Sequence, residues 1–189
     1  MDAEYSPTMD EAAGLASAPA PSLEATLVIA ARQGDRTAFG RLYERFAPMV
    51  HGLLLARVPR SDVDDLVQEV FLQAMKRLDS LRNPEALGPW LAAIARNRAR
   101  DHYRSTEPVV QLTDDVAGAI HPEGGALGVL AAIRRLPEAY RETLMLRLVE
   151  GMTGPEIAER TGLTPGSVRV NLHRGMQMLR EALGGSMRT

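Results

Sequence analysis

Cysteine is absent from the 189 residues of this chain. The absence excludes disulfide bonds and thiolate metal ligands, and with them any redox or zinc sensing by the chain itself. The histidines do not compensate, because they are scattered without the spacing of metal ligands: His51, His102, His121 and His173. We therefore expect no metal site and no cofactor.

Long apolar runs are missing too. None approaches the roughly 20 residues that cross a bilayer, and no basic segment followed by an apolar one opens the chain. We expect a cytoplasmic protein without membrane insertion. No stretch alternates with period two for long enough to indicate a sheet, so the expected fold class is all-α. The sequence also offers no nucleophile–base pair, no glycine-rich phosphate loop and no paired carboxylates in an apolar setting, so we expect no enzyme and no catalytic residues.

Charge is distributed unevenly, although the net charge is only −2. Residues 1–24, 25–104, 105–125 and 126–189 carry net charges of −5, +4, −4 and +3. Two basic modules are typical of a chain that touches nucleic acid in two places. The predicted organisation is a disordered Ala/Pro/Ser tail, a small helical domain, an extended acidic linker, a second small helical domain and a short tail, over residues 1–24, 25–105, 106–126, 127–185 and 186–189.

The first module shows helical periodicity from Leu27. Ser61 followed by Asp64 predicts a capping box, after which one apolar face should be buried by Val63, Leu66, Val67, Val70, Phe71, Ala74 and Leu78. Asp64, Asp65, Gln68 and Glu69 then point outward. Pro84 is expected to open the next helix, with Trp90 in its core and Arg96, Asn97, Arg100, Asp101 and Arg104 largely outward.

In the second module, apolar residues predict helical cores interrupted at Pro137 and Gly151: Leu127, Leu130, Ile133, Leu136, Leu144, Leu146 and Leu148. A helix–turn–helix follows, with a short helix from Pro155, a turn at 161–164 and a long helix from Pro165 to Leu183. Its second helix is expected to present Arg169, Val170, His173, Arg174 and Gln177 outward, where a recognition helix enters the major groove.

These features together resemble the extracytoplasmic-function (ECF) sigma factors, the compact members of the bacterial sigma-70 family. The resemblance covers about residues 25–184 and rests on motifs in the family's order. The first domain is similar to sigma-2 through residues 62–71 and 89–104, and the second is similar to sigma-4 through residues 136–142, 156–158 and 166–169. The recognition helix departs from the family pattern at Val170, Asn171, Gly175 and Met176, so the resemblance does not fix the exact −35 sequence.

The resemblance implies an RNA polymerase sigma factor that directs promoter recognition, melting and transcription initiation. Its partners would be core RNA polymerase, through the clamp helices of the largest subunit and the region that contacts the −35 domain, promoter DNA, and an anti-sigma factor where one exists. The resemblance assigns polymerase binding to Asp65, Gln68 and Glu69. It assigns contacts with melted −10 DNA to Leu81, Arg82, Asn83, Arg96, Asn97, Arg100 and Arg104. Contacts with duplex −35 DNA are assigned to Ser167, Arg169, Val170, His173 and Arg174.

Two other functions are compatible with parts of this pattern. A helix–turn–helix regulator would bind duplex DNA tightly without being a polymerase subunit. A helical interaction protein, such as an adaptor, would show no salt-dependent DNA affinity. An exposed acidic helix face is also found on many solvated helices, so Asp65, Gln68 and Glu69 alone do not distinguish these readings.

Overall fold

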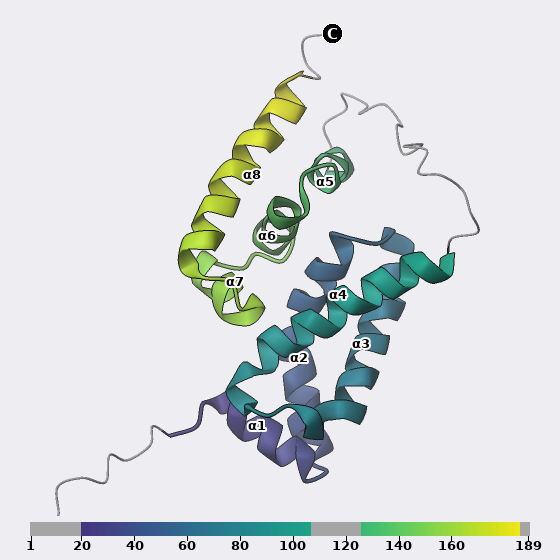
Figure 1. Ribbon diagram of the computed structural model, residues 1–189, viewed down its shortest axis with the longest axis vertical. Helices are drawn as coiled ribbons and strands as arrows, with labels where there is room; N and C mark the ends of the chain where they lie inside the picture. Colours follow the sequence, from purple (N-terminus) through teal and green to yellow (C-terminus); the bar gives the residue numbers. More distant parts are fainter. Residues whose placement is uncertain (1–19, 107–125, 186–189) are drawn as a thin grey trace, which may run out of the picture.

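The computed structural model describes residues 20–106 and 126–185, which form helices joined by short turns (Figure 1). No strand occurs among these residues, so the all-α prediction is confirmed. The α-helices are α1 (Leu23–Arg32), α2 (Arg36–Leu55), α3 (Val63–Arg77), α4 (Leu87–Thr106), α5 (Ala126–Arg134), α6 (Glu138–Leu148), α7 (Gly154–Thr161) and α8 (Pro165–Gly185), and short 3-10 turns span Arg60–Asp62, Leu78–Ser80 and Pro84–Ala86. Residues 1–19 of the tail expected over 1–24, residues 107–125 of the linker expected over 106–126, and the expected tail 186–189 lie outside the described residues. The end of the first expected tail is instead helical, since α1 begins at Leu23.

Helices α1 to α4 form the first bundle, in which α2 packs against the other three. Ser22 and Asp35 cap the starts of α1 and α2, because their side-chain oxygens accept hydrogen bonds from backbone N–H groups of the first turn. The Ser22 cap starts α1 at Leu23, four residues before the helical pattern expected from Leu27. Trp90 is partly buried against the core, as its phase in the helix predicts.

Helix α3 buries the predicted apolar stripe, and Asp64, Asp65, Gln68 and Glu69 are all exposed. The capping box predicted at Ser61 is wrong. Residues Arg60–Asp62 form a 3-10 turn after Pro59, and the Ser61 hydroxyl lies 2.7 Å from a carboxylate oxygen of Asp62 instead of capping α3. The helix therefore begins at Val63 without a side-chain cap.

Helices α5 to α8 form the second bundle. Two residues predicted in its core are exposed: Leu127 is 68% exposed and Leu148 is 46% exposed. Leu127 lies in the first turn of α5 and Leu148 is the last residue of α6, so both residues lie at helix ends. Helix α6 is buried over five consecutive residues, Glu142–Leu146, because it packs against α8 on one side and against α2 of the first bundle on another.

The helix–turn–helix consists of α7 and α8, as predicted. Thr153 forms the capping box of α7 with Glu156, which the sequence analysis did not identify. Gly162 ends α7 with a φ of +76°, a backbone conformation that side chains disfavour. Thr164 caps α8, since its hydroxyl accepts a hydrogen bond of 3.1 Å from the backbone N–H of Ser167.

Gly175 lies at a close contact between α8 and α6. A Cβ atom at this position would lie 3.0 Å from the Leu144 side chain and 3.2 Å from that of Tyr140. Helix propensity alone makes a glycine here unfavourable by about 1 kcal/mol relative to alanine. The close approach of α6 gives the physical reason for its presence.

The two bundles pack directly on each other, α6 on α2 and α7 on α4 (Figure 1). At one edge of this contact, Nδ1 of His51 on α2 lies 2.6 Å from Oε1 of Glu150, which follows α6. The hydrogen bond to Glu150 raises the pKa of His51, and this effect outweighs burial, which acts in the opposite direction.

The raised pKa predicts a pH dependence of folding. Protonated His51 stabilises the folded chain fully below its unfolded pKa of about 6.5, and this contribution is lost as the pH rises through the higher folded pKa. Between pH 6 and pH 8.5, we expect the wild type to lose about 0.5–1 kcal/mol more unfolding free energy than Glu150→Gln. Urea titrations measure the difference, and an NMR titration of the His51 ring should show a lower pKa in the variant. Equal losses in both proteins would contradict the assignment.

Candidate polymerase-binding and nucleic-acid-binding surfaces

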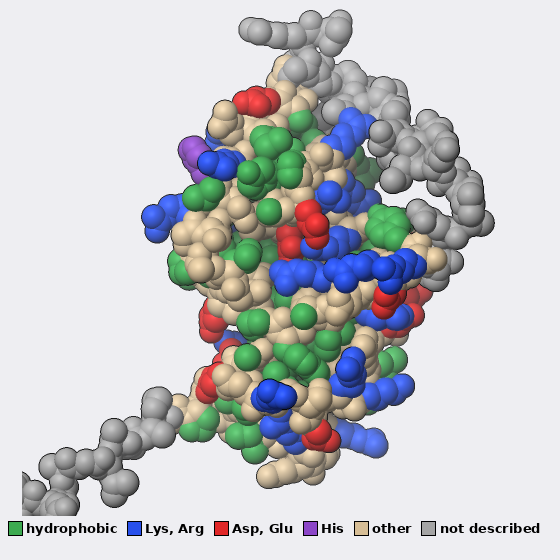
Figure 2. Space-filling model, viewed as in Figure 1, with side chains coloured by type: hydrophobic (Ala, Val, Ile, Leu, Met, Phe, Trp, Pro, Cys, Tyr) green, Lys and Arg blue, Asp and Glu red, His purple; other side chains and the backbone are tan. Residues whose placement is uncertain are grey.

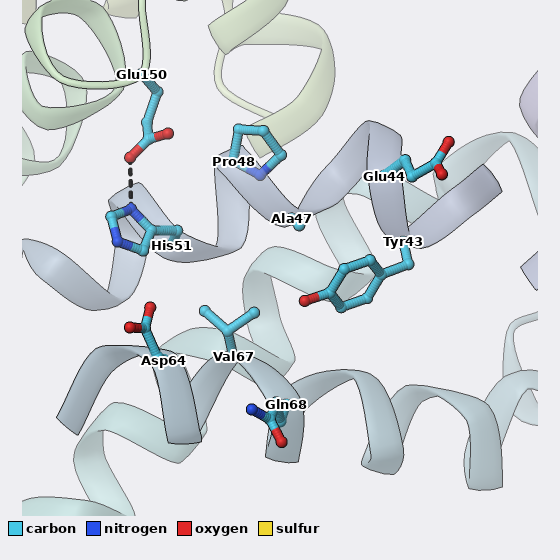
Figure 3. Close-up of a pocket in the computed structure, with 9 residues that line it drawn as sticks. All are labelled: Tyr43, Glu44, Ala47, Pro48, His51, Asp64, Val67, Gln68 and Glu150. Atoms are coloured by element: carbon cyan, nitrogen blue, oxygen red, sulfur yellow. Dashed lines mark hydrogen bonds and ion pairs between the residues drawn. The ribbon is translucent and has the colours of Figure 1, made fainter. Parts of the chain in front are cut away.

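An acidic groove runs between α2 and α3 beside the predicted polymerase-binding face (Figure 3). Its volume is about 620 Å³. Gln68 lines it, whereas Asp65 and Glu69 are exposed on α3 outside the lining. The groove is lined by Tyr43, Glu44, Ala47, Pro48, His51, Asp64, Val67, Gln68 and Glu150. Its carboxylates and partly apolar floor suit a basic amphipathic helix.

Two acidic contributors to this groove were missed by the sequence analysis. Glu44 belongs to α2, and Glu150 comes from the second bundle. Pro48 adds a feature of its own, because it lies within α2 and has no N–H with which to bond the Glu44 carbonyl. In the sequence, Glu44 could be noticed as an acidic residue within an amphipathic helix, and Pro48 as a proline within the same helix. No local signal pointed to Glu150, which reaches the groove only through the packing of the bundles.

Glu69 forms an ion pair with Arg98 of α4. The Nε atom of Arg98 is buried without a hydrogen-bond partner. Of the three predicted polymerase-binding residues, Glu69 is therefore held toward α4. Asp65 and Gln68 project from α3, and neither side chain has a hydrogen-bond or ion-pair partner among the described residues. The acidic face thus offers one paired and two unpaired side chains to a partner.

The loop before α4 presents fewer side chains than predicted. Leu81 is only 5% exposed, and its carbonyl accepts a hydrogen bond from Arg32, so it holds the loop against the core. Arg82 and Asn83 are exposed. Asn83 also accepts a hydrogen bond of 3.1 Å from the N–H of Glu85, which fixes the turn leading into α4.

Arg96, Arg100 and Arg104 follow one another at four-residue steps, which places them on one side of α4. Basic side chains gather along this helix in the space-filling view (Figure 2). Arg100 and Arg104 are exposed, and Arg100 donates a hydrogen bond of 3.3 Å to Asn97. Arg96 differs from the others because it is half-buried and its Nη2 donates to Glu142 of α6 at 2.7 Å. One predicted DNA-binding arginine is therefore occupied by the second bundle.

The recognition helix leaves all five predicted −35 residues exposed: Ser167, Arg169, Val170, His173 and Arg174. Val168 is buried on the opposite side, which fixes the orientation of α8 on its bundle. Within the described parts of the chain, neither Arg169 nor Arg174 is paired with a carboxylate. Both guanidinium groups are available to base edges or phosphates.

The searched residues contain neither a metal-like cluster nor a membrane-length helix. Within 20–106 and 126–185, no three His, Asp or Glu side chains are grouped so as to hold a metal ion. In the same ranges, no helix combines the length and the apolar character that crossing a membrane requires.

Comparison with known proteins assigns both bundles. The model of sigma-70 region 2 matches residues 42–108, and that of sigma-70 region 4 matches residues 127–179. The chain is 34% identical to the RNA polymerase sigma factor CarQ of Myxococcus xanthus over 81% of this chain and 93% of CarQ. It is 31% identical to the ECF RNA polymerase sigma-E factor of Escherichia coli over 81% of this chain and 90% of that protein.

Solved structures agree with this assignment. CnrH in complex with the cytosolic domain of CnrY aligns with a TM-score of 0.62 and 26% identity, covering 87% of this chain and 99% of CnrH. The sigma factor RpoE in complex with the anti-sigma factor NepR from Bartonella quintana aligns with a TM-score of 0.55 and 25% identity, over 77% and 96% of the two chains. Both region models match in the family's order, and the relatives are of matching length. The chain therefore belongs to the sigma-70 family, as an RNA polymerase sigma factor of the ECF type.

Proposed function

We propose that this sigma factor binds core RNA polymerase through the acidic face of α3, holds melted −10 DNA with α4 and its preceding loop, and reads duplex −35 DNA with α8. The observation that carries the proposal is the placement of one acidic and two basic surfaces on separate helices of a single chain. An acidic face suits a basic protein partner, and arginine-rich helices suit phosphates.

The two basic surfaces suit different forms of DNA. Helix α8 follows a tight turn and presents arginines from its N-terminal half, which is the geometry that enters a major groove. Helix α4 has a row of arginines next to Asn97 and an exposed loop at Arg82 and Asn83. Unpaired bases display hydrogen-bonding edges, which such a loop holds while the arginines contact the backbone.

In this role the chain carries out no chemical step, because polymerisation belongs to the core enzyme. The protein then acts in the cytoplasm with the polymerase and the DNA. RpoE of Bartonella quintana was solved with an anti-sigma factor. By analogy, an anti-sigma protein is a candidate partner here, and occupying the acidic groove would compete with polymerase.

Transcription reconstituted from purified components tests this function. Core polymerase with the chain should initiate from a cognate promoter, identified by selection from a random promoter library, and neither component alone should do so. Tight duplex binding by the free chain without polymerase-dependent initiation would favour the helix–turn–helix regulator. Absence of both activities, with no salt-dependent DNA affinity, would favour the adaptor.

Charge reversal on α3 tests polymerase binding. Asp65→Arg places a like charge against a basic partner, so we expect core-polymerase affinity to fall by about 2 kcal/mol or more in a fluorescence titration. Asp79→Arg is the matched control, because Asp79 is exposed beyond the end of α3 and the net charge changes equally. Equal affinities for the two variants, with helicity retained by circular dichroism, would remove the assignment.

Alanine substitution in α8 tests base reading. An arginine that contacts a guanine edge contributes roughly 1–3 kcal/mol of discrimination, whereas one on a phosphate weakens all sequences alike. We expect Arg174→Ala to relax preference at one −35 position, and Arg169→Ala to act on a base or on the backbone. Arg180→Ala, exposed in the C-terminal half of α8, serves as the control. A uniform loss across a panel of −35 variants would leave Arg174 a phosphate contact only.

A further inference from the structure

Val170 is an exposed apolar side chain on the recognition helix. It is 46% exposed, and among the large apolar side chains exposed in the described ranges it is the one that α8 carries. It lies outside the apolar core, to which α8 contributes Val168 and Leu179. Valine also forms helices less well than alanine or an unbranched residue. Neither core packing nor helix propensity therefore explains a valine at this position.

Val170 points directly away from the second bundle. Helix α8 packs against α5, α6 and α7, with Val168 and Leu179 buried in that contact. Successive residues of an α-helix are about 100° apart around its axis, so Val170 lies roughly 160° from Val168 and 180° from Leu179. Arg174 lies about 40° to one side of Val170, and Arg169 about 100° to the other. Val170 is therefore on the midline of the outward face, where a side chain reaches deepest into a groove that receives α8.

The residues one turn before Val170 on this face are small. Gly166 and Ser167 precede it by four and three residues, and both are exposed. The fold does not require a glycine at position 166, because a Cβ atom there would meet only the Thr164 hydroxyl, at 3.9 Å. The Ser167 hydroxyl lies 2.8 Å from that of Thr164, so it is held toward the start of α8. A helix face without long side chains at this point allows a close approach to a ligand.

We propose that Val170 reads the C5-methyl group of a thymine in the −35 element, by apolar contact on the floor of the major groove. The inference rests on the proposed function, because it requires α8 to bind duplex −35 DNA. Thymine is the one base that presents an apolar group in the major groove. A valine against adenine, guanine or cytosine would instead cover hydrogen-bonding groups without bonding to them.

The place of Val170 on the helix also assigns roles to the neighbouring arginines. Arg174 follows by four residues, about 6 Å along the helix axis, which corresponds to about two base-pair steps in DNA. The thymine therefore lies within about two base pairs of the guanine expected for Arg174. Arg169 leaves the helix on the flank of the outward face, toward the rim of the groove, where the phosphates lie. Of the two alternatives for Arg169, this geometry selects the backbone contact.

Deoxyuridine tests the thymine contact directly, because it differs from thymidine in the base only by lacking the C5-methyl group. Holoenzyme assembled from core polymerase and the chain is titrated with the promoter selected from the random library. The same titration is repeated with promoters in which a single −35 thymine, on either strand, is replaced by deoxyuridine. We expect one replacement to weaken binding about fourfold, which is the effect of exposing one buried methyl group.

Val170→Ala completes a double-mutant cycle with this replacement. Alanine lacks both methyl groups of valine, so the same replacement should weaken binding of the variant less than about twofold. Val149→Ala is the matched control, because Val149 is 47% exposed and lies outside α8, and it should keep the full fourfold loss. Each result is a ratio of two affinities of one protein, so a general loss of polymerase binding or stability cancels.

Three results would overturn the assignment. They are a selected −35 element without thymine, thymines whose replacement has no effect on the unmodified protein, and a loss that is equally large in Val170→Ala. If the holoenzyme does not initiate, the proposed function fails, and the cycle is measured with the free chain on duplexes that it selects. A fourfold loss that disappears in Val170→Ala would then keep the thymine contact without promoter initiation. Absence of duplex binding by the free chain as well would remove both proposals.

Discussion

A single buried carboxylate sets how the two halves of this molecule are arranged. Glu142 lies in the middle of α6, and its charge is balanced only by Arg57 and Arg96 of the other domain. Without these partners it would be an unpaired charge in a nearly buried position, which is strongly unfavourable. The packing of α6 on α2 and of α7 on α4 accompanies this pairing.

Local patterns in the sequence predicted the elements whose environment is local. The apolar stripe of α3 and the turn between α7 and α8 follow from spacing and capping chemistry, and both occur in the structure. The prediction of a capping box at Ser61 was wrong, because the chain forms a 3-10 turn directly after Pro59, before α3 begins. The core prediction was wrong for Leu127 and Leu148, because periodicity does not reveal that a residue at the end of a helix is not covered by neighbouring helices.

For the candidate surfaces, the sequence could predict which side chains are exposed but not which other side chains they contact. The sequence places Asp65 and Arg174 outside, and the structure agrees. Which partner a side chain meets depends on contacts between distant segments, such as Glu69 with Arg98 or Arg96 with Glu142, which lie 29 and 46 residues apart. Glu150 reaches the acidic groove in the same way. These pairings come from packing between elements, about which helical periodicity carries no information.

The pairing of Arg96 with Glu142 makes the contact between the two bundles less sensitive to salt than a surface ion pair. Salt screens exposed charges over about 10 Å at 0.1 M, so surface ion pairs weaken as the salt concentration rises. The contact of Arg96 with the nearly buried Glu142 is less accessible to ions. A rise in salt therefore weakens the exposed ion pairs on the surface of each bundle more than it weakens this contact between them.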